Sequence, residues 1–216
     1  MAAAIGEQTA PIPMNLAVED ALCEAAIVKL IAGRSYYFNT IYNTGGYGYL
    51  KKNMPAFNFA SKHTPFLVLT DLDNTYPCPS ELIGTWLNRR DKHHNLLLRV
   101  AVREVEAWFL ADKEALGSYL SSEIINVPDD VEIITDPKNL IIDISRKSSR
   151  KEIREDMCPK SQTTSKIGPN YNARMVHFAQ NNWRPNIARQ HSNSLNRTIL
   201  RLEQYRPIWP INELPA

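Results

Sequence analysis

The sequence predicts an α/β fold in which a mostly parallel sheet of about four strands lies between helices. First, strand-like and helix-like apolar patterns alternate over the first two thirds of the chain, as they do in successive βα units. Second, residues 66–70 form a continuous apolar run, which is typical of a strand covered on both faces of a sheet. Third, the last third of the chain shows only helical patterns, so a helical region follows the sheet.

The first two predicted strands are residues 14–18 and residues 36–42. The first is apolar, and residues 20–32 follow it with apolar side chains at helical spacing. The second is aromatic and β-branched, which favours a strand. Residues 45–49 are rich in glycine and predict a turn that lets backbone approach a ligand. A helix through residues 57–60 comes next.

The other two predicted strands are residues 66–70 and residues 96–102. We expect the first of them to be central in the sheet, because it has no polar face. Residues 80–89 between them form a short helix. The apolar spacing of residues 105–119 then predicts one continuous helix.

The organisation changes beyond residue 121, where prolines and aspartates mark a linker. The sequence therefore predicts a core at residues 1–125 and a helical, basic extension at residues 126–216 that packs on it. The extension contains four predicted helices, at residues 138–145, 150–157, 172–181 and 192–205.

Length and composition indicate an ordinary globular protein. The chain has 216 residues, 44% of them hydrophobic, which is enough for a real core. Its start lacks the pattern of a signal peptide, and no segment approaches the roughly 20 apolar residues of a membrane span, so we expect a cytoplasmic protein with no membrane contact. The cysteines, Cys23, Cys78 and Cys158, are odd in number and widely spaced, which predicts reduced thiols.

The charge is unevenly divided along the chain. Residues 138–206 contain 14 Lys and Arg against 5 Asp and Glu, a net charge of +9, whereas the remainder has a net charge of −7. A basic segment of this density favours a polyanionic partner such as nucleic acid, because neutralised phosphates release counterions. A solvated helical face is the alternative explanation.

Carboxylates follow three of the predicted strands. Glu19 follows the first, Asp71 and Asp73 follow the third, and Glu104 and Glu106 follow the fourth. Ligands of open α/β sheets bind outside the carboxyl ends of the strands, so we expect these acids to converge. Several carboxylates in one cleft indicate a hard divalent cation such as Mg²⁺. Alternatively, the aspartates begin turns and Glu106 is a first-turn acid of a helix.

Several segments carry a family resemblance that covers nearly the whole chain. Its most specific part is the block Arg103-Glu104-Val105-Glu106-Ala107-Trp108, and its least specific is Asp71-Leu72-Asp73. With Val18-Glu19, Asp136-Pro137-Lys138, Lys166-Ile167-Gly168-Pro169, Tyr171 and Ser192-Asn193-Ser194-Leu195, these segments resemble the Toprim-like proteins grouped as the DUF4276 family.

The resemblance implies a Toprim fold with a Mg²⁺ or Mn²⁺ centre. Glu19 matches the Toprim glutamate, Asp71 and Asp73 match its Asp-x-Asp, and Glu104 and Glu106 match acids special to this family. Of these, Glu19, Asp71, Asp73 and Glu106 are the expected metal ligands. The chain departs from the pattern at Asp20, where many Toprim proteins have glycine. This aspartate could supply a further ligand or cap the helix that follows.

The resemblance also implies metal-dependent hydrolysis of phosphodiester bonds. We expect Glu19, Asp71, Asp73, Glu104 and Glu106 to be catalytic, with Lys166 as a cationic helper. The expected nucleic-acid contacts are Lys51, Lys52, Arg103, Lys147 and Lys166.

Proteins of this broader nuclease group are encoded beside ATPases in defence loci. We therefore expect an effector nuclease of a bacterial anti-phage system, with an ATPase partner, DNA more than RNA as substrate, and a possible homo-oligomer. A non-catalytic nucleic-acid- or protein-binding subunit and a Toprim nucleotidyl transferase are the alternatives.

Overall fold

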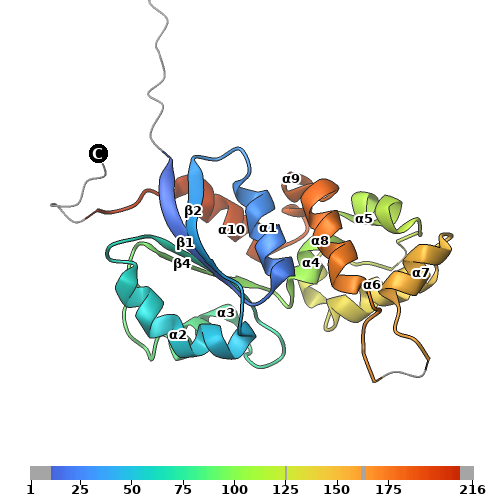
Figure 1. The fold of residues 1–216 in the computed structure, drawn as a ribbon, viewed down its shortest axis with the longest axis horizontal. Coiled ribbons are helices and arrows are strands. Elements are labelled where there is room, and N and C mark those ends of the chain that lie inside the picture. The colour runs from blue at the N-terminus through green and yellow to red at the C-terminus, as the bar shows by residue number, and fades with distance from the viewer. Residues whose placement is uncertain (1–10, 125, 162–163, 210–216) are drawn as a thin grey trace, which may run out of the picture.

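The computed structural model describes residues 11–124, 126–161 and 164–209. It has the predicted α/β fold, with a four-stranded, all-parallel sheet flanked by helices (Figure 1). The strand order is β2-β1-β3-β4. The strands are β1 (Ile12–Val18), β2 (Tyr36–Tyr42), β3 (Phe66–Asp71) and β4 (Leu96–Ala101).

Strand β3 is central, as its continuous apolar run predicts. It pairs with β1 on one side and β4 on the other, and all six of its residues are buried. Val18 is in register with Leu69, and Asp71 with Ala101. The carboxyl ends of β1, β3 and β4 therefore lie close together, and the residues that follow them are brought to one edge of the sheet.

Two helices, α2 (Gly46–Ala60) and α3 (Pro79–Trp86), cover one face of the sheet (Figure 1). Helix α2 begins inside the stretch for which the sequence predicts a turn, so most of residues 45–49 form its first turn instead. Gly45 and Gly46 both have left-handed φ angles, of 99° and 60°, and a Cβ at Gly45 would also clash with the side chain of Tyr49.

The opposite face is covered by α1 (Ala21–Ile31) together with helices from the end of the chain. Helix α8 (Tyr171–Asn181) packs along α1, and α10 (Asn193–Gln204) packs on β4. Their buried apolar side chains belong to the same hydrophobic cluster as those of the sheet. The hydrophobic core thus runs without a break from the sheet into the C-terminal helices.

The helix predicted at residues 105–119 is in fact two helices, α4 (Val105–Leu110) and α5 (Lys113–Leu120). The break lies at Asp112, whose carboxylate accepts a hydrogen bond from the backbone N–H of Ala115 and so begins a new helix. The same carboxylate is fully buried and pairs with Arg184 at 2.6 Å.

The C-terminal region contains the four predicted helices and two short ones that the sequence pattern does not predict. The short ones are the 3-10 helix η1 (Val131–Ile133) and α9 (Pro185–Ala188). The others are α6 (Pro137–Arg146), α7 (Lys151–Met157), α8 and α10. Helices α6 and α7 lie to one side of the sheet, whereas α8 and α10 pack on α1 and β4, and the molecule has an elongated shape (Figure 1).

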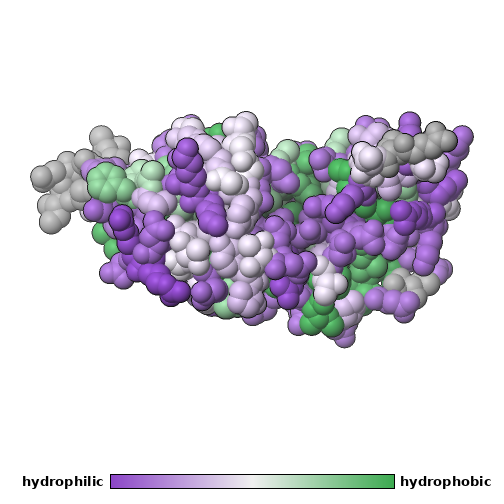
Figure 2. Space-filling model, turned by 90° about the horizontal axis from the view of Figure 1, so that it is seen from below, coloured by the Kyte–Doolittle hydropathy of each residue, from purple (hydrophilic) through white to green (hydrophobic). Residues whose placement is uncertain are grey.

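The described surface is mostly polar. Figure 2 shows a largely hydrophilic face with small hydrophobic areas. No helix within residues 11–124, 126–161 and 164–209 has both the length and the apolar character that crossing a membrane requires. Cys23, Cys78 and Cys158 are free thiols, as predicted.

Candidate functional site

The carboxyl ends of β1, β3 and β4 bring together the acids that the sequence singles out. Asp71 is the centre of this group. Burial raises the pKa of its carboxyl well above the ordinary value, and the charges of Glu106, Glu19, Asp20 and Asp73 raise it further. Each of these groups is thus close enough to affect Asp71, which is itself only 9% exposed.

Glu19 is fixed to the neighbouring strand. Its Oε1 accepts hydrogen bonds from the hydroxyl of Thr70 and from the backbone N–H of Asp71, the latter at 3.1 Å. Burial raises the pKa of the Glu19 carboxyl, although these two hydrogen bonds lower it in part. The side chain is therefore held in one orientation at the end of β1.

Asp71 is fixed from the other side by helix α4. Its Oδ1 accepts a hydrogen bond of 2.9 Å from the backbone N–H of Val105, the first residue of that helix. Helix N-termini offer N–H groups without partners in the helix, so this contact satisfies one of them. This bond joins the last residue of β3 to the helix after β4.

Asp73 reaches the site by a route that strand alternation does not predict. Strand β3 ends at Asp71, and Asp73 lies beyond it with a left-handed φ of 50°. The backbone N–H groups of Leu72 and Asp73 both donate to the carbonyl of Arg103, each at 3.0 Å. A tight loop held against the end of β4 therefore places Asp73.

Glu104 and Glu106 share one cation, Lys138 of helix α6. The Nζ atom of Lys138 lies 3.7 Å from Oε1 of Glu104 and 3.4 Å from Oε1 of Glu106. The backbone N–H of Lys138 also donates to Oε2 of Glu104 at 3.2 Å. Burial alone would lower the pKa of Lys138, but the carboxylates of Glu106, Glu104 and Asp71 together raise it.

Glu106 lies in the first turn of α4, as one of the two sequence interpretations has it, yet it is only 1% exposed. The hydroxyl of Tyr171 donates to its Oε1 at 3.3 Å. Burial raises the pKa of Glu106 to about 7; Lys138 lowers this pKa and Glu104 raises it. Burial therefore favours the protonated form of this carboxyl.

Asp20 caps helix α1. Its Oδ1 accepts hydrogen bonds from the backbone N–H groups of Leu22 and Cys23, at 3.0 and 2.9 Å. Of the two roles that the sequence allows, capping is the one that the contacts show. Its negative charge still acts on the site, because it raises the pKa of Asp71 and of Glu19.

The predicted cations are spread over the molecule. Lys166 is exposed in the loop before α8, and Lys147 is exposed at the end of α6. Lys51 and Lys52 are exposed on α2, with Lys51 above the rings of Tyr47 and Tyr76.

Arg103 is the predicted cation that contacts the loop of the acids. Its Nη1 donates to the carbonyl of Asp73 at 3.3 Å. For Lys166, no hydrogen bond or ion pair to a carboxylate exists within the described part of the chain.

Comparisons with family models, curated proteins and solved structures found no match. The function of the site must therefore be argued from its own residues.

Lys138 and Tyr171 are the site residues that sequence reasoning does not assign to the site. They lie far along the chain from the acids, and only the packing of α6 and α8 against α4 brings them there. The one signal for them is that both belong to segments that carry the family resemblance.

The oxygen ligands that the acids supply are those that a hard cation prefers. Glu19, Asp71, Asp73, Glu104 and Glu106 supply carboxylate oxygens, whereas Lys138 alone pairs with any of them among the described residues. Within the same residues, no three His, Cys, Asp or Glu side chains already stand in an arrangement that could hold a metal ion. The acids thus outnumber the cation that pairs with them, and their arrangement would have to change for them to share an ion.

Proposed function

We propose that this protein is a Mg²⁺-dependent or Mn²⁺-dependent nuclease that hydrolyses phosphodiester bonds of nucleic acid. One observation carries the proposal: two buried carboxylates, Asp71 and Glu106, and three half-buried ones, Glu19, Asp73 and Glu104, gather after three parallel strands, and Lys138 alone pairs with any of them among the described residues. Uncompensated charges are unstable inside a protein, so a bound divalent cation would relieve their repulsion.

The residues that would hold the ion are Glu19, Asp71, Asp73 and Glu106. Mg²⁺ binds through carboxylate oxygens and keeps several waters, which leaves room for a phosphate oxygen. When bound, the ion would lower the pKa of a water and stabilise negative charge on the phosphoryl group and leaving oxygen.

The chain's own contacts support this role by fixing the orientation of the acids. Glu19 and Asp71 each use one oxygen to accept backbone N–H bonds, so the other oxygen can turn toward an ion. Lys138 holds Glu104 and Glu106 near the end of β4 and balances part of their charge. Of the cations considered, Lys138 is thus better placed than Lys166 to act beside the acids.

The biological setting rests on the Toprim-like resemblance. It supports an effector nuclease of a bacterial anti-phage defence system that works with an ATPase partner. The basic character of residues 138–206 supports a nucleic-acid substrate, with DNA favoured over RNA. A homo-oligomer of the chain is compatible with the same setting.

The test is a cleavage assay with Asp71→Asn, which keeps the size of the side chain and removes its charge. Supercoiled, linear and single-stranded DNA, and RNA, are incubated with Mg²⁺ or Mn²⁺ and wild-type protein. We expect cleavage that EDTA abolishes and that Asp71→Asn lowers at least about a hundredfold, the scale of an electrostatic contribution to a transition state.

Asp129→Asn is the matched control, because the Asp129 side chain is 94% exposed and its ion pair is with Lys113, not with a residue of the site. It should cleave like the wild type. Equal activity of wild type and Asp71→Asn on every substrate, with the ATPase partner present, would refute the proposal.

One observation favours a second candidate, a non-catalytic nucleic-acid-binding subunit. Lys138 pairs with both Glu104 and Glu106, which is what acids with a structural role would show. Calorimetric titration with Mn²⁺ separates the candidates. Binding that Asp71→Asn weakens supports the nuclease, whereas no binding to the wild type supports the structural role.

A further inference from the structure

A pocket of about 280 Å³ lies beside the outer edge of β4, between α3 and α10. Three arginines line it: Arg99 from β4, Arg103 from the segment after β4, and Arg197 from α10. Pro79 and Ile83 of α3 contribute apolar wall. The pocket is therefore a concave surface that concentrates guanidinium groups.

These arginines have no carboxylate partner within the described residues. Nε of Arg99 donates to the hydroxyl of Thr198 at 3.2 Å, and Nη1 of Arg103 donates to the carbonyl of Asp73 at 3.3 Å. The pocket wall also contains Glu132, but its Oε1 already accepts hydrogen bonds from Ser192 and from the backbone of Ser194. Most guanidinium N–H groups of the pocket thus remain available.

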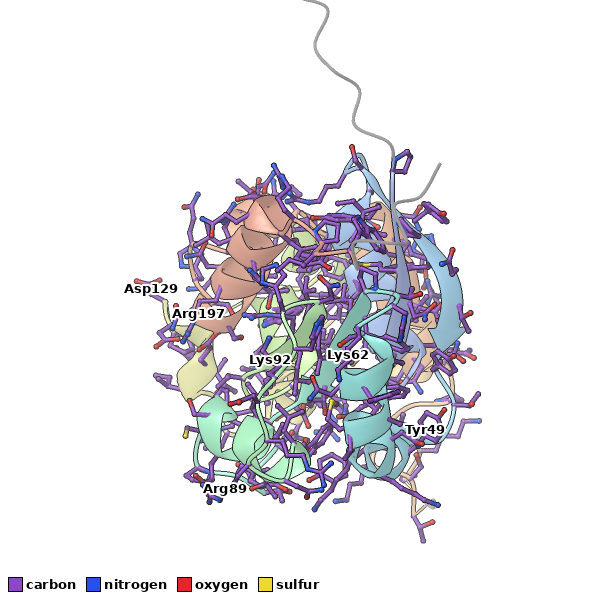
Figure 3. The ribbon with its side chains drawn as sticks, turned by 90° about the vertical axis from the view of Figure 1, so that its left-hand side faces the viewer. Tyr49, Lys62, Arg89, Lys92, Asp129 and Arg197 are labelled. Carbon is purple, nitrogen blue, oxygen red and sulfur yellow. The ribbon has the colours of Figure 1, made fainter. Side chains whose placement is uncertain are left out.

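The positive charge continues along the edge of β4. Lys92 donates from Nζ to the carbonyl of Leu96 at 2.8 Å, and Arg201 donates from Nη2 to the carbonyl of His94 at 3.3 Å. We call Lys92, Arg99, Arg103, Arg197 and Arg201 the β4-edge cations. Figure 3 looks onto this side of the molecule, where Arg197 and Lys92 are labelled.

Four of the β4-edge cations, Lys92, Arg99, Arg197 and Arg201, lie close enough for their charges to repel. The pKa of Arg99 is lowered to about 10, first by burial and then by the charges of Arg197 and Arg201. The pKa of Lys92 is lowered by burial and by Arg201 and Arg99. An arrangement of like charges around a pocket is destabilising until an anion enters it, and guanidinium groups match a phosphate well because they donate two hydrogen bonds at once.

We propose that this pocket binds a phosphate group, and that the phosphate belongs to a nucleic-acid strand lying along the β4-edge cations. The pocket adjoins the acids: Leu72 and Arg103 line it, and the same two residues hold the loop that carries Asp71 and Asp73. A strand bound there continues toward the carboxylates. The inference that the pocket binds phosphate rests on the pocket alone. The inference that this phosphate belongs to a nucleic-acid strand rests on the proposed function.

The first experiment measures binding without cleavage. A fluorescein-labelled single strand and the matching duplex are titrated in EDTA, and anisotropy gives the dissociation constant. Arg197→Gln tests the pocket, because Arg197 is exposed on α10 and its loss leaves the fold intact. Arg146→Gln is the control, since it removes an equal charge from an exposed site on α6.

We expect Arg197→Gln to weaken binding about tenfold and to reduce the slope of log affinity against log salt by about one, as the loss of one phosphate contact does. Arg146→Gln should weaken binding less than twofold. Equal effects of the two substitutions would overturn the strand as the ligand.

The second experiment identifies the source of the phosphate. Pyrophosphate is compared with chloride at equal ionic strength by thermal unfolding of wild type, Arg99→Gln and Arg197→Gln. Suppose that pyrophosphate stabilises the wild type alone and that the strand binds all three proteins equally. The pocket then binds a free phosphate compound, and the proposal that the phosphate belongs to a nucleic-acid strand is overturned. If neither ligand distinguishes the variants, phosphate binding is overturned.

The proposed function can fail separately. Strand binding that depends on Arg197, together with no cleavage under any condition, supports the pocket and refutes the nuclease.

Discussion

The carboxyl of Glu106 lies between two different partners, the ammonium of Lys138 at 3.4 Å and the hydroxyl of Tyr171 at 3.3 Å. Burial makes ionisation of this carboxyl unfavourable and raises its pKa to about 7. The sequence could predict that Glu106 is near Asp71, because strand ends converge in a parallel sheet. It could not predict Lys138 and Tyr171, because long-range packing of helices determines which side chains meet.

The raised pKa of Glu106 predicts how stability depends on pH in EDTA. The folded protein holds this proton more tightly than the unfolded chain, whose pKa is the ordinary 4.5. The contribution is therefore fully present below about pH 4.5 and is lost as pH rises through about 7, an effect on the order of 3 kcal/mol. We expect urea denaturation of the wild type to show this fall.

Glu106→Gln should flatten that dependence, because an amide has no proton to lose. The slope decreases without vanishing, since the pKa of Asp71 is raised as well. Glu155→Gln, which changes an exposed acid of α7, is the control and should follow the wild type. A Glu106→Gln curve that parallels the wild type would show that folding does not raise the pKa of this carboxyl.

Helix α4 is the element that connects the acids to the rest of the molecule. All six of its residues are buried. The backbone N–H of its first residue donates to Asp71. The indole N–H of Trp108 donates to the hydroxyl of Ser194 at 2.8 Å, and the backbone carbonyl of Trp108 accepts from the indole N–H of Trp183 at 3.2 Å. The apolar spacing of residues 105–119 predicts helix correctly but hides the break at Asp112, because an apolar pattern does not show that this carboxylate caps a new helix. The same carboxylate pairs with Arg184, far along the chain.

The pair of Asp112 and Arg184 should therefore matter for stability. The Asp112 side chain is fully buried, so removing its cation leaves a charge without compensation. Because the Arg184 side chain is 42% exposed, water screens the pair in part, yet we expect Arg184→Ala to lower the free energy of unfolding more than the loss of a fully exposed ion pair does.

Arg150→Ala is a matched control, since Arg150 and its partner Glu152 are both about half exposed. It should change the free energy of unfolding by less than about 1 kcal/mol. Urea denaturation measures both changes. Equal losses in the two variants would mean that burial of Asp112 adds nothing to the pair.

At the scale of the whole molecule, the position of the cations in the fold differs from what a charge count along the sequence predicts. Many cations of residues 138–206 pair with nearby acids, among them Arg146 with Asp143 and Arg174 with Asp156. The β4-edge cations have no ion pair with an acid among the described residues, and three of them, Lys92, Arg99 and Arg103, come from outside that segment. A count along the sequence predicts that a basic region exists but not where it lies.

The shared core predicts that residues 1–125 do not fold alone. Without α8 and α10, the apolar side chains of α1 and of one sheet face would meet water. We expect this fragment to lack a cooperative thermal transition by circular dichroism. Mixing it with residues 126–216 should restore one, and a cooperative transition of the isolated fragment would show that the core is divisible.

The two edges of the sheet differ in a way that bears on self-association. At the edge of β4, half-buried cations hinder pairing with another strand. The hydroxyl of Ser194 also accepts a hydrogen bond from the backbone N–H of Val102, just after β4. Strand β2 has no charged residue, and Tyr37 and Ile41 on it are exposed. If two copies join their sheets about a two-fold axis, β2 is the edge open to them. Strands paired across such an axis run antiparallel, so the carboxylate groups would lie at opposite margins of one continuous eight-stranded sheet, facing away from each other.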